Sequence, residues 1–363
     1  MQSVQIQQFF KQKIMVTFFD LLTGKKHKDQ KSFVLPKQTA TPKNFIGGPK
    51  IRTIFMGTPA FSAEILSALV KEKYNIVSVV TKLDQKVGRK QEVEESAIKK
   101  EAIKNNIPVL QIAKFDEEAI LKLRDLKPDL IVVAAYGKIL PDAVLALPGF
   151  GCINVHASLL PKFRGASPIQ NALLLGETQT GISIMQMDAG MDTGAIFSQT
   201  SLDIEPEDTK DILYTKLTEL GKQLLIETLP KIIEQTITPV PQKNEEATLC
   251  QLIEREDGHV MWTEGAPNIY NRYRALYPWP GLFSLWKTED GLVRLKLMEI
   301  SYQKQSPKSP HMLGEVFEMG EKIAVQTSEG IIFLEEVQLE GKSRVSIEDF
   351  LRGNKTLLGS FLQ

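Results

Sequence analysis

The stretch Ile153-Asn154-Val155-His156 places two polar side chains at the end of an apolar run. Residues two apart on a strand point to the same side of a sheet, so Asn154 and His156 are expected to project together. A neutral imidazole can take a proton from a nucleophile near pH 7, and a carboxamide can donate to an oxygen on which negative charge develops. The pair therefore suits acyl transfer through a tetrahedral intermediate. The alternative is a hydrogen-bonded core histidine; the chain holds only 4 histidines, and Asn154 beside this one favours chemistry.

A third group is needed to orient the imidazole. Asp188 and Asp192 lie in a glycine-rich stretch, residues 186–194, that follows an apolar run. A carboxylate that reaches His156 would hold the ring and stabilise its protonated form. Asp192, between Gly190 and Gly194, is the preferred candidate, and the alternative is that these acids bind loop amides. Cys152 is interpreted as a small buried core residue and not as a nucleophile.

The elements that must position these residues alternate from residue 51 onward, which predicts a doubly wound, mainly parallel α/β sheet. The expected strands are residues 51–56, 76–80, 109–112, 130–134, 151–155 and 181–187. The expected helices are residues 61–70, 92–105, 116–126, 169–175 and one from Asp208 or Thr209 to Ile232. Ligands of such sheets bind at the carboxyl ends of strands. The turn at residues 57–59 lacks the G-x-G-x-x-G pattern, so a dinucleotide cofactor is not expected.

The character of the chain changes after the long helix. Residues 236–248, with Pro239 and Pro241, are predicted to be an inter-domain linker. Beyond them, residues 293–297 alternate as a half-buried antiparallel strand does, and 323–325 and 331–337 are further expected strands. Ser346 with Asp349 indicates a capping box before a short last helix. The second domain is therefore expected to be a small β-barrel.

Length and composition indicate an ordinary globular protein of two domains. The chain has 363 residues, 42% of them hydrophobic, and no apolar run long enough to span a bilayer. Its 2 cysteines cannot form a disulfide framework or a metal site, which favours a reducing compartment. Residues 1–50 carry nine lysines against Asp20 and Asp29. We expect a disordered or irregular extension without a catalytic role; a targeting segment and an RNA-binding arm are the alternatives.

Three motifs around these candidate residues resemble one enzyme family. Residues 154–161 (NVHASLLP), 163–170 (FRGASPIQ) and 187–194 (MDAGMDTG) closely resemble the methionyl-tRNA formyltransferases. The resemblance extends through residues 55–59 and 135–141 to 277–280 and 337–342. It covers nearly all of residues 51–363, which makes it highly specific, and residues 1–50 lie outside it.

The resemblance implies a Rossmann-like catalytic domain at residues 51–235 and an OB-like, tRNA-binding domain at 249–363. It implies transfer of a formyl group from 10-formyltetrahydrofolate to the α-amine of methionine on initiator tRNA, with Asn154, His156 and Asp192 as catalytic residues and no metal. The implied folate-binding residues are Ser158, Leu159, Leu160 and Pro161, with backbone around Ile139 and Leu140 receiving the pterin. A cytoplasmic monomer is expected, or an organellar protein if residues 1–50 are a transit segment.

The family also carries a tRNA-contacting loop, and here the chain departs from the pattern. Lys86, Arg89 and Lys90 match its basic positions, but Leu83 stands where proline is usual and residues 94–97 (EESA) replace a proline-containing segment. Two added acids should weaken phosphate contacts slightly, and a solvated charged loop is the alternative. From Leu249 onward, thirteen Lys and Arg face sixteen Asp and Glu, so net charge gives no support to RNA binding. Local candidates are Tyr270, Arg272, Tyr273, Arg274, Tyr277, Lys342 and Arg344.

Other functions use the same three catalytic residues. A glycinamide-ribonucleotide or nucleotide-sugar formyltransferase would transfer the formyl group to a small amine, and a formyltetrahydrofolate hydrolase would transfer it to water. An inactive RNA-binding protein on the same scaffold is a different class. The C-terminal domain and residues 277–280 favour a macromolecular acceptor, and the intact triad disfavours an inactive protein.

Overall fold

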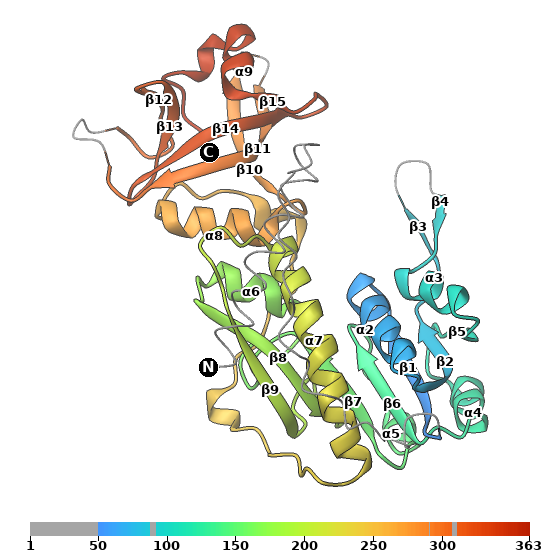
Figure 1. Ribbon diagram of the computed structural model, residues 1–363. Coiled ribbons are helices and arrows are strands. Elements are labelled where there is room, and N and C mark those ends of the chain that lie inside the picture. Colours follow the sequence, from blue (N-terminus) through green and yellow to red (C-terminus); the bar gives the residue numbers. More distant parts are fainter. Residues whose placement is uncertain (1–49, 88–91, 290, 307–310) are drawn as a thin grey trace, which may run out of the picture. The chain divides into compact units, whose positions relative to one another are not determined.

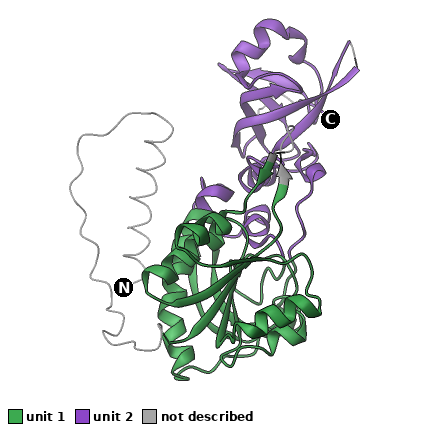
Figure 2. Ribbon diagram, turned by 90° about the vertical axis from the view of Figure 1, so that its right-hand side faces the viewer, with its two compact units in different colours: residues 1–165, 179–203, 214–249 green, residues 166–178, 204–213, 250–363 purple. Residues whose placement is uncertain are grey.

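The computed structural model describes residues 50–363 except 88–91, 290 and 307–310. This part of the chain forms two compact units, which Figure 2 shows in two colours. The first unit contains the described parts of residues 50–165, 179–203 and 214–249. The second contains residues 166–178, 204–213 and 250–363, so two short internal segments belong with the C-terminal part. Among the described residues, no helix is both long and apolar enough to cross a bilayer.

The first unit is built on a seven-stranded sheet of order β5-β2-β1-β6-β7-β8-β9 (Figure 1). Its first five strands run parallel, and β8 and β9 are antiparallel. The predicted doubly wound, mainly parallel sheet is thereby confirmed. The strands are β1 (Arg52–Gly57), β2 (Asn75–Thr81), β5 (Val109–Gln111), β6 (Leu130–Ala134), β7 (Cys152–His156), β8 (Gln179–Gln186) and β9 (Ile196–Asp203).

The central strands are apolar because helices cover both of their faces. Every residue of β6 and β7 is buried, as expected for parallel strands inside an α/β unit. One core cluster joins Leu123 and Val144, from α4 (Glu117–Asp125) and α5 (Asp142–Leu145), to Val133 and Cys152 of the sheet. The helix α2 (Ala60–Lys71) contacts β1 and β6. The long helix α7 (Lys210–Ile233) begins one residue after Thr209, which is one of the two residues predicted to cap it. Packing of these helices on the sheet holds β7 in place.

The sequence prediction of one helix over residues 92–105 was partly wrong. Glu92–Glu94 forms the strand β4, which pairs with β3 (Gln85–Val87) in a hairpin. The helix α3 (Ala97–Lys104) starts later because the Ser96 hydroxyl caps it, accepting from the amide of Lys99. The edge strand β9 was not predicted, since its exposed face carries polar residues and its apolar signal is weak.

The second unit contains an antiparallel sheet of order β10-β11-β14-β13-β12, with β15 on β14. Isolated β-bridges join Leu362 to Trp286 in the edge strand β10, and Phe361 to Glu315 next to the other edge strand, β12. The sheet thus curls as the predicted OB-like domain requires. The expected strands lie in β11, β13 and β14, and the Ser346 hydroxyl caps the last helix as predicted. The elements are α6 (Pro168–Leu174), α8 (Ala266–Leu276), β10 (Leu282–Thr288), β11 (Gly291–Gln303), β12 (Val316–Met319), β13 (Lys322–Gln326), β14 (Ile331–Leu339), β15 (Val345–Ser346) and α9 (Ile347–Gly353).

Candidate active site

Asn154 and His156 lie at the carboxyl end of β7, on the same side of the sheet. They are buried, with 8% and 6% of their surfaces exposed. Cys152 lies two residues before Asn154 on this side, packed in the core cluster with Val144 of α5. Two hydrogen-bonding side chains therefore lie at the carboxyl end of an otherwise apolar, buried strand.

Asp192 joins this pair from the loop between β8 and β9. Its Oδ1 accepts from Asn154 Nδ2 at 3.3 Å, and its Oδ2 lies 3.6 Å from His156 Nδ1. The amide of Gly165 donates to the same Oδ2 at 2.8 Å. The carboxylate is held from three sides, yet the Asp192 side chain keeps 16% of its surface exposed. The structure therefore brings together the three residues that the sequence analysis selected.

The two acids of this loop have different partners. Asp188 Oδ1 accepts from the Gly190 amide and the Thr193 hydroxyl, within its own loop. Asp192 has a positive φ of 54°, a left-handed conformation that Asp tolerates better than most residues. A side chain at Gly194 would collide with the carbonyl oxygen of Gln186, so the loop requires glycine there. These backbone features turn the Asp192 carboxylate toward β7.

The imidazole of His156 lies between two acceptors. Its Nε2 is 2.8 Å from the carbonyl oxygen of Phe163, and its Nδ1 faces Asp192. Phe163 also has a positive φ, 60°, which is unusual for a bulky side chain. The Phe163 carbonyl and the Asp192 carboxylate therefore fix the orientation of the ring.

The loop that follows His156 is held from behind by β8 and β9. The Ser183 hydroxyl donates to the carbonyl of Ser158 at 2.6 Å and accepts from the amide of Leu160 at 3.1 Å. Gln199 Nε2 donates to Ser183 Oγ and to the Leu160 carbonyl, both at 2.8 Å. Ser158 and Leu160 are buried, and Leu159 and Pro161 are half-buried. The expected folate-binding segment is thus a fixed loop, and its supports were not recognised in the sequence.

Residues 135–140 extend from β6, the strand next to β7. Ile139 is 71% exposed, whereas Leu140 is buried in the core. Lys138 Nζ donates to the carbonyls of Ile112 and Ala113, at 2.5 and 2.6 Å. Burial and the nearby Lys82 ammonium lower the pKa of Lys138. Ile139 is therefore an exposed apolar side chain at the edge expected to receive a flat heterocycle.

The predicted linker residues make an unexpected contribution. Gln242, Asn244 and Thr248 contact the segments that carry Asp192 and Phe163. Arg164 is buried and donates to Gln242 and Asn244. No sequence pattern indicates these contacts, because a polar stretch with prolines between two domains is typical of a linker.

Cys152 does not have the surroundings of a nucleophile. Burial raises the pKa of its thiol to about 12, so the thiol remains protonated near neutral pH. Its Sγ lies 4.0 Å from the carbonyl oxygens of Val144 and Leu145, inside the core. This environment is that of a structural cysteine.

The residues expected to contact tRNA are only partly described. The backbone of Lys86 lies in β3, while Arg89 and Lys90 lie outside the described residues. In the second unit, Arg272 donates to Glu264 and to the carbonyls of Asp257 and His259. Arg274 is buried, and Arg344 pairs with Glu299 and Glu336.

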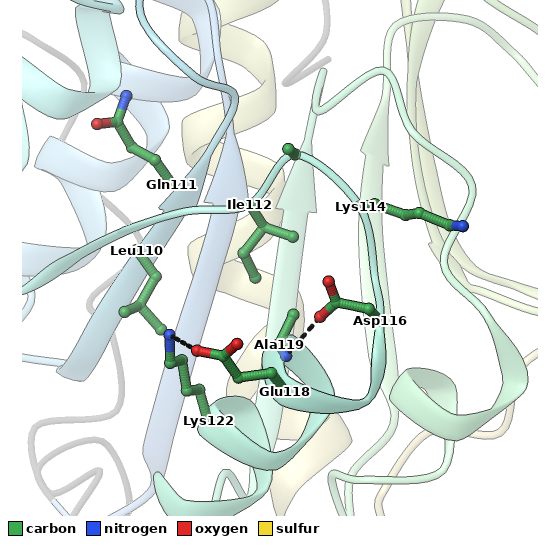
Figure 3. Close-up of a pocket in the computed structure, with 9 residues that line it drawn as sticks. Leu110, Gln111, Ile112, Lys114, Asp116, Glu118, Ala119 and Lys122 are labelled. Atoms are coloured by element: carbon green, nitrogen blue, oxygen red, sulfur yellow. Dashed lines mark hydrogen bonds and ion pairs between the residues drawn. The ribbon is translucent and has the colours of Figure 1, made fainter.

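A separate pocket of about 230 Å³ lies at the end of β5 beside α4 (Figure 3). Among its polar side chains, Lys122 pairs with Glu118, and Asp116 accepts from the amide of Ala119. None of the expected catalytic or folate-binding residues lines it. Within the described residues, no group of three or more His, Cys, Asp or Glu side chains could hold a metal ion.

Sequence comparison identifies the family. Residues 50–229 match the Formyl transferase family, and residues 252–355 match Formyl transferase, C-terminal domain. The methionyl-tRNA formyltransferase of Caldicellulosiruptor saccharolyticus is 45% identical over 314 residues, 85% of this chain and 99% of that protein. The chain belongs to the methionyl-tRNA formyltransferase family. A relative of the same name from Enterococcus faecalis is 39% identical, over 83% of this chain and 96% of its own length.

More distant solved structures share the fold. The N-formyltransferase from Helicobacter canadensis, in complex with folinic acid and dTDP-3-aminofucose, superposes with a TM-score of 0.57 at 20% identity. It covers 78% of this formyltransferase and 98% of its own chain. HypX from Aquifex aeolicus, in complex with tetrahydrofolic acid, has a TM-score of 0.56 at 16% identity, over 83% of this chain and 47% of its own.

Proposed function

We propose that this enzyme transfers the formyl group of 10-formyltetrahydrofolate to the α-amine of methionyl initiator tRNA. The observation that carries the proposal is the convergence of Asn154, His156 and Asp192 in a chain that is 45% identical to a methionyl-tRNA formyltransferase. The three groups supply an amide donor, an imidazole between two acceptors and a carboxylate. This set serves acyl transfer to an amine without a covalent enzyme intermediate.

Each residue has a distinct role in the proposed mechanism. The methionine amine attacks the formyl carbon, and the carbonyl electron pair moves onto oxygen. Asn154 donates its remaining N–H to this oxyanion, and protonated His156 stabilises the same charge. Asp192 orients the imidazole and offsets its positive charge. The amine loses a proton, directly or through water, and the bond to the folate nitrogen breaks as that nitrogen gains a proton.

The donor and the tRNA occupy different parts of the chain in this proposal. Ser158, Leu159, Leu160 and Pro161 bind the folate, with Ile139 and the backbone at Leu140 against the pterin. Lys86, Arg89 and Lys90 contact tRNA phosphates. Residues 51–235 carry out formyl transfer, residues 236–248 connect the domains, and residues 249–363 bind tRNA. We propose a cytoplasmic monomer, with residues 1–50 outside the chemistry.

One assay separates this function from its rivals. Purified protein is incubated with 10-formyltetrahydrofolate and either charged initiator tRNA or free small amines. Formyl-methionine appearing only on the tRNA is the expected result. Formylation of a small amine would indicate a small-molecule transferase, and donor consumption without acceptor would indicate a hydrolase. Binding of tRNA without turnover would leave an inactive RNA-binding protein.

A further inference from the structure

The polypeptide between α7 and the second unit returns to the candidate site. Val240 and Ile196 exchange two backbone hydrogen bonds of 2.8 Å, which ties this segment to β9. Further along, the Thr248 carbonyl accepts from the Arg164 amide at 2.9 Å, and the Thr248 hydroxyl accepts from the Phe163 amide at 2.8 Å. All of these residues belong to the first unit. Residues 240–248 are therefore anchored on both sides of the Asp192 loop.

Gln242 lies between these anchors and contacts the Asp192 loop directly. Its Nε2 donates to the carbonyls of Asp192 at 2.9 Å and Gly194 at 2.7 Å. Its Oε1 accepts from Arg164, from Nε at 3.1 Å and Nη2 at 2.8 Å. Since a guanidinium only donates, the carboxamide oxygen must face Arg164 and its NH₂ must face the two carbonyls. The Gln242 carboxamide can therefore make all of these hydrogen bonds in only one orientation.

Hydrogen bonds connect Asp192 to residues 164, 165 and 242 in one continuous network. Arg164 fixes Gln242, Gln242 fixes the Asp192 backbone, and Gly165, next to Arg164, donates to the Asp192 carboxylate. Arg164 is 6% exposed and has a second acceptor in Asn244 Oδ1 at 2.9 Å. Asp192 adopts a left-handed φ of 54°, so external contacts must stabilise its backbone. Main chain and side chain of Asp192 are held by neighbouring parts of one network.

We infer that Gln242 is a positioning residue for Asp192, with Arg164 as its anchor. The inference rests on the proposed catalytic role of Asp192. Gln242 is placed to act through the loop: it fixes the direction in which the carboxylate meets His156. Misplacement of a reacting group by about 1 Å can lower turnover by a factor of ~10², so loss of two hydrogen bonds should act on kcat. Substrate binding should change little, because Gln242 contacts neither expected binding segment.

Gln242→Glu is the most informative variant. It keeps the volume and an acceptor for Arg164 but replaces both donors by an oxygen that repels the two carbonyls. Gln242→Met keeps the length without polar contacts and serves if the first variant does not fold. Gln223→Ala is the matched control, because Gln223 is an exposed glutamine of α7 bonded to Glu227. Far-UV circular dichroism and urea unfolding establish that the variants are folded at the assay temperature.

The test is a double-mutant cycle with Asp192→Asn, measured as kcat for formylation of charged initiator tRNA. We expect Gln242→Glu to lower kcat by about 10- to 100-fold with either KM within a factor of ~3. In the Asp192→Asn background it should lower kcat by no more than ~2-fold, because the group it positions has lost its charge. Gln223→Ala should stay within ~2-fold in both backgrounds.

Two results would overturn the inference while leaving the proposed function intact. One is wild-type kcat for Gln242→Glu and Gln242→Met, and the other is the same fold-loss in both backgrounds, which indicates a general structural role. Near-normal activity of Asp192→Asn alone has a different meaning. It would remove Asp192 from the mechanism, and the positioning role would fall with it.

Discussion

The two units use their buried polar groups for different purposes. Around Asp192 in the first unit, donors from β7, from Gly165 and from Gln242 converge on one residue that retains some exposure. In the second unit, Arg274 donates to the backbone carbonyls of Glu205 and Asp208 and to the side chain of Asn271. The first arrangement places an amide and an imidazole at the carboxyl end of β7, while the second ties a buried guanidinium to backbone carbonyls of residues 205 and 208. A buried charge by itself does not indicate a functional site. The indication in the first unit is that several donors converge on Asp192, which remains partly exposed.

Removal of the His156 imidazole should have the largest effect on activity, and it tests whether the polar groups of the first unit form a catalytic site. His156→Ala should lower kcat for tRNA formylation by roughly 10²–10³, the usual cost of removing a group that stabilises an oxyanion. Folate binding, measured by titration calorimetry, should be largely retained because His156 precedes the expected binding loop. His311→Ala is the control, since His311 pairs with Glu315 in the other unit. Near-normal turnover of the His156 variant would refute the mechanism.

Substitution of Arg274 tests whether the buried polar groups of the second unit contribute to stability. Burial lowers the pKa of this guanidinium, yet several acceptors surround it. Arg274→Met removes the hydrogen bonds of this guanidinium from a buried region and should reduce the free energy of unfolding by about 2–4 kcal/mol, measured by urea denaturation. Arg344→Met should cost under ~1 kcal/mol, because its pairs with Glu299 and Glu336 are exposed. Equal losses would mean that burial does not separate the two arginines.

Cys152 tests whether the residue beside the site belongs to the core. Burial raises the pKa of its thiol from 9.0 to about 12, so above pH 9 the unfolded chain loses a proton that the folded chain keeps. Stability should therefore fall as pH rises from about 9 toward 12, by up to ~1.4 kcal/mol per pH unit from this group. Cys152→Ala should show a shallower fall in urea unfolding at pH 8, 9 and 10. It should also keep formylation activity; loss of activity in a folded variant would contradict a purely structural role.

The smallest effect concerns tRNA contacts and compares two arginines again. Arg89→Ala should reduce the slope of log affinity against log salt by about one unit, as expected when one phosphate contact is lost. Arg344→Ala should leave the slope unchanged, because two carboxylates already neutralise that guanidinium. Filter binding of initiator tRNA over a salt series measures both. If only Arg344→Ala reduced the slope, the result would indicate that Arg344 of the second unit, and not Arg89, contacts the tRNA.

The proposed catalytic residues could be selected from the sequence because local patterns indicate them. Asn154 and His156 share a strand face by the period of two, and Asp192 stands in a glycine-rich loop after the next strand. The hairpin formed by β3 and β4 was not accessible. Three-residue strands contain too little pattern to distinguish them from the start of an exposed helix.

The sequence by itself determined the family, the mainly parallel sheet with its OB-like partner, and the three residues that meet at the end of β7. These depend on short-range periodicity and on motifs of contiguous residues. Only the tertiary structure decided that Gln242, fifty residues after Asp192, donates to its backbone, and that Ser183 supports the loop after His156. It also decided that Arg274 is buried while Arg344 is paired with carboxylates at the surface. Such roles depend on which distant backbone groups need a partner after the chain has folded, and no local pattern encodes that need.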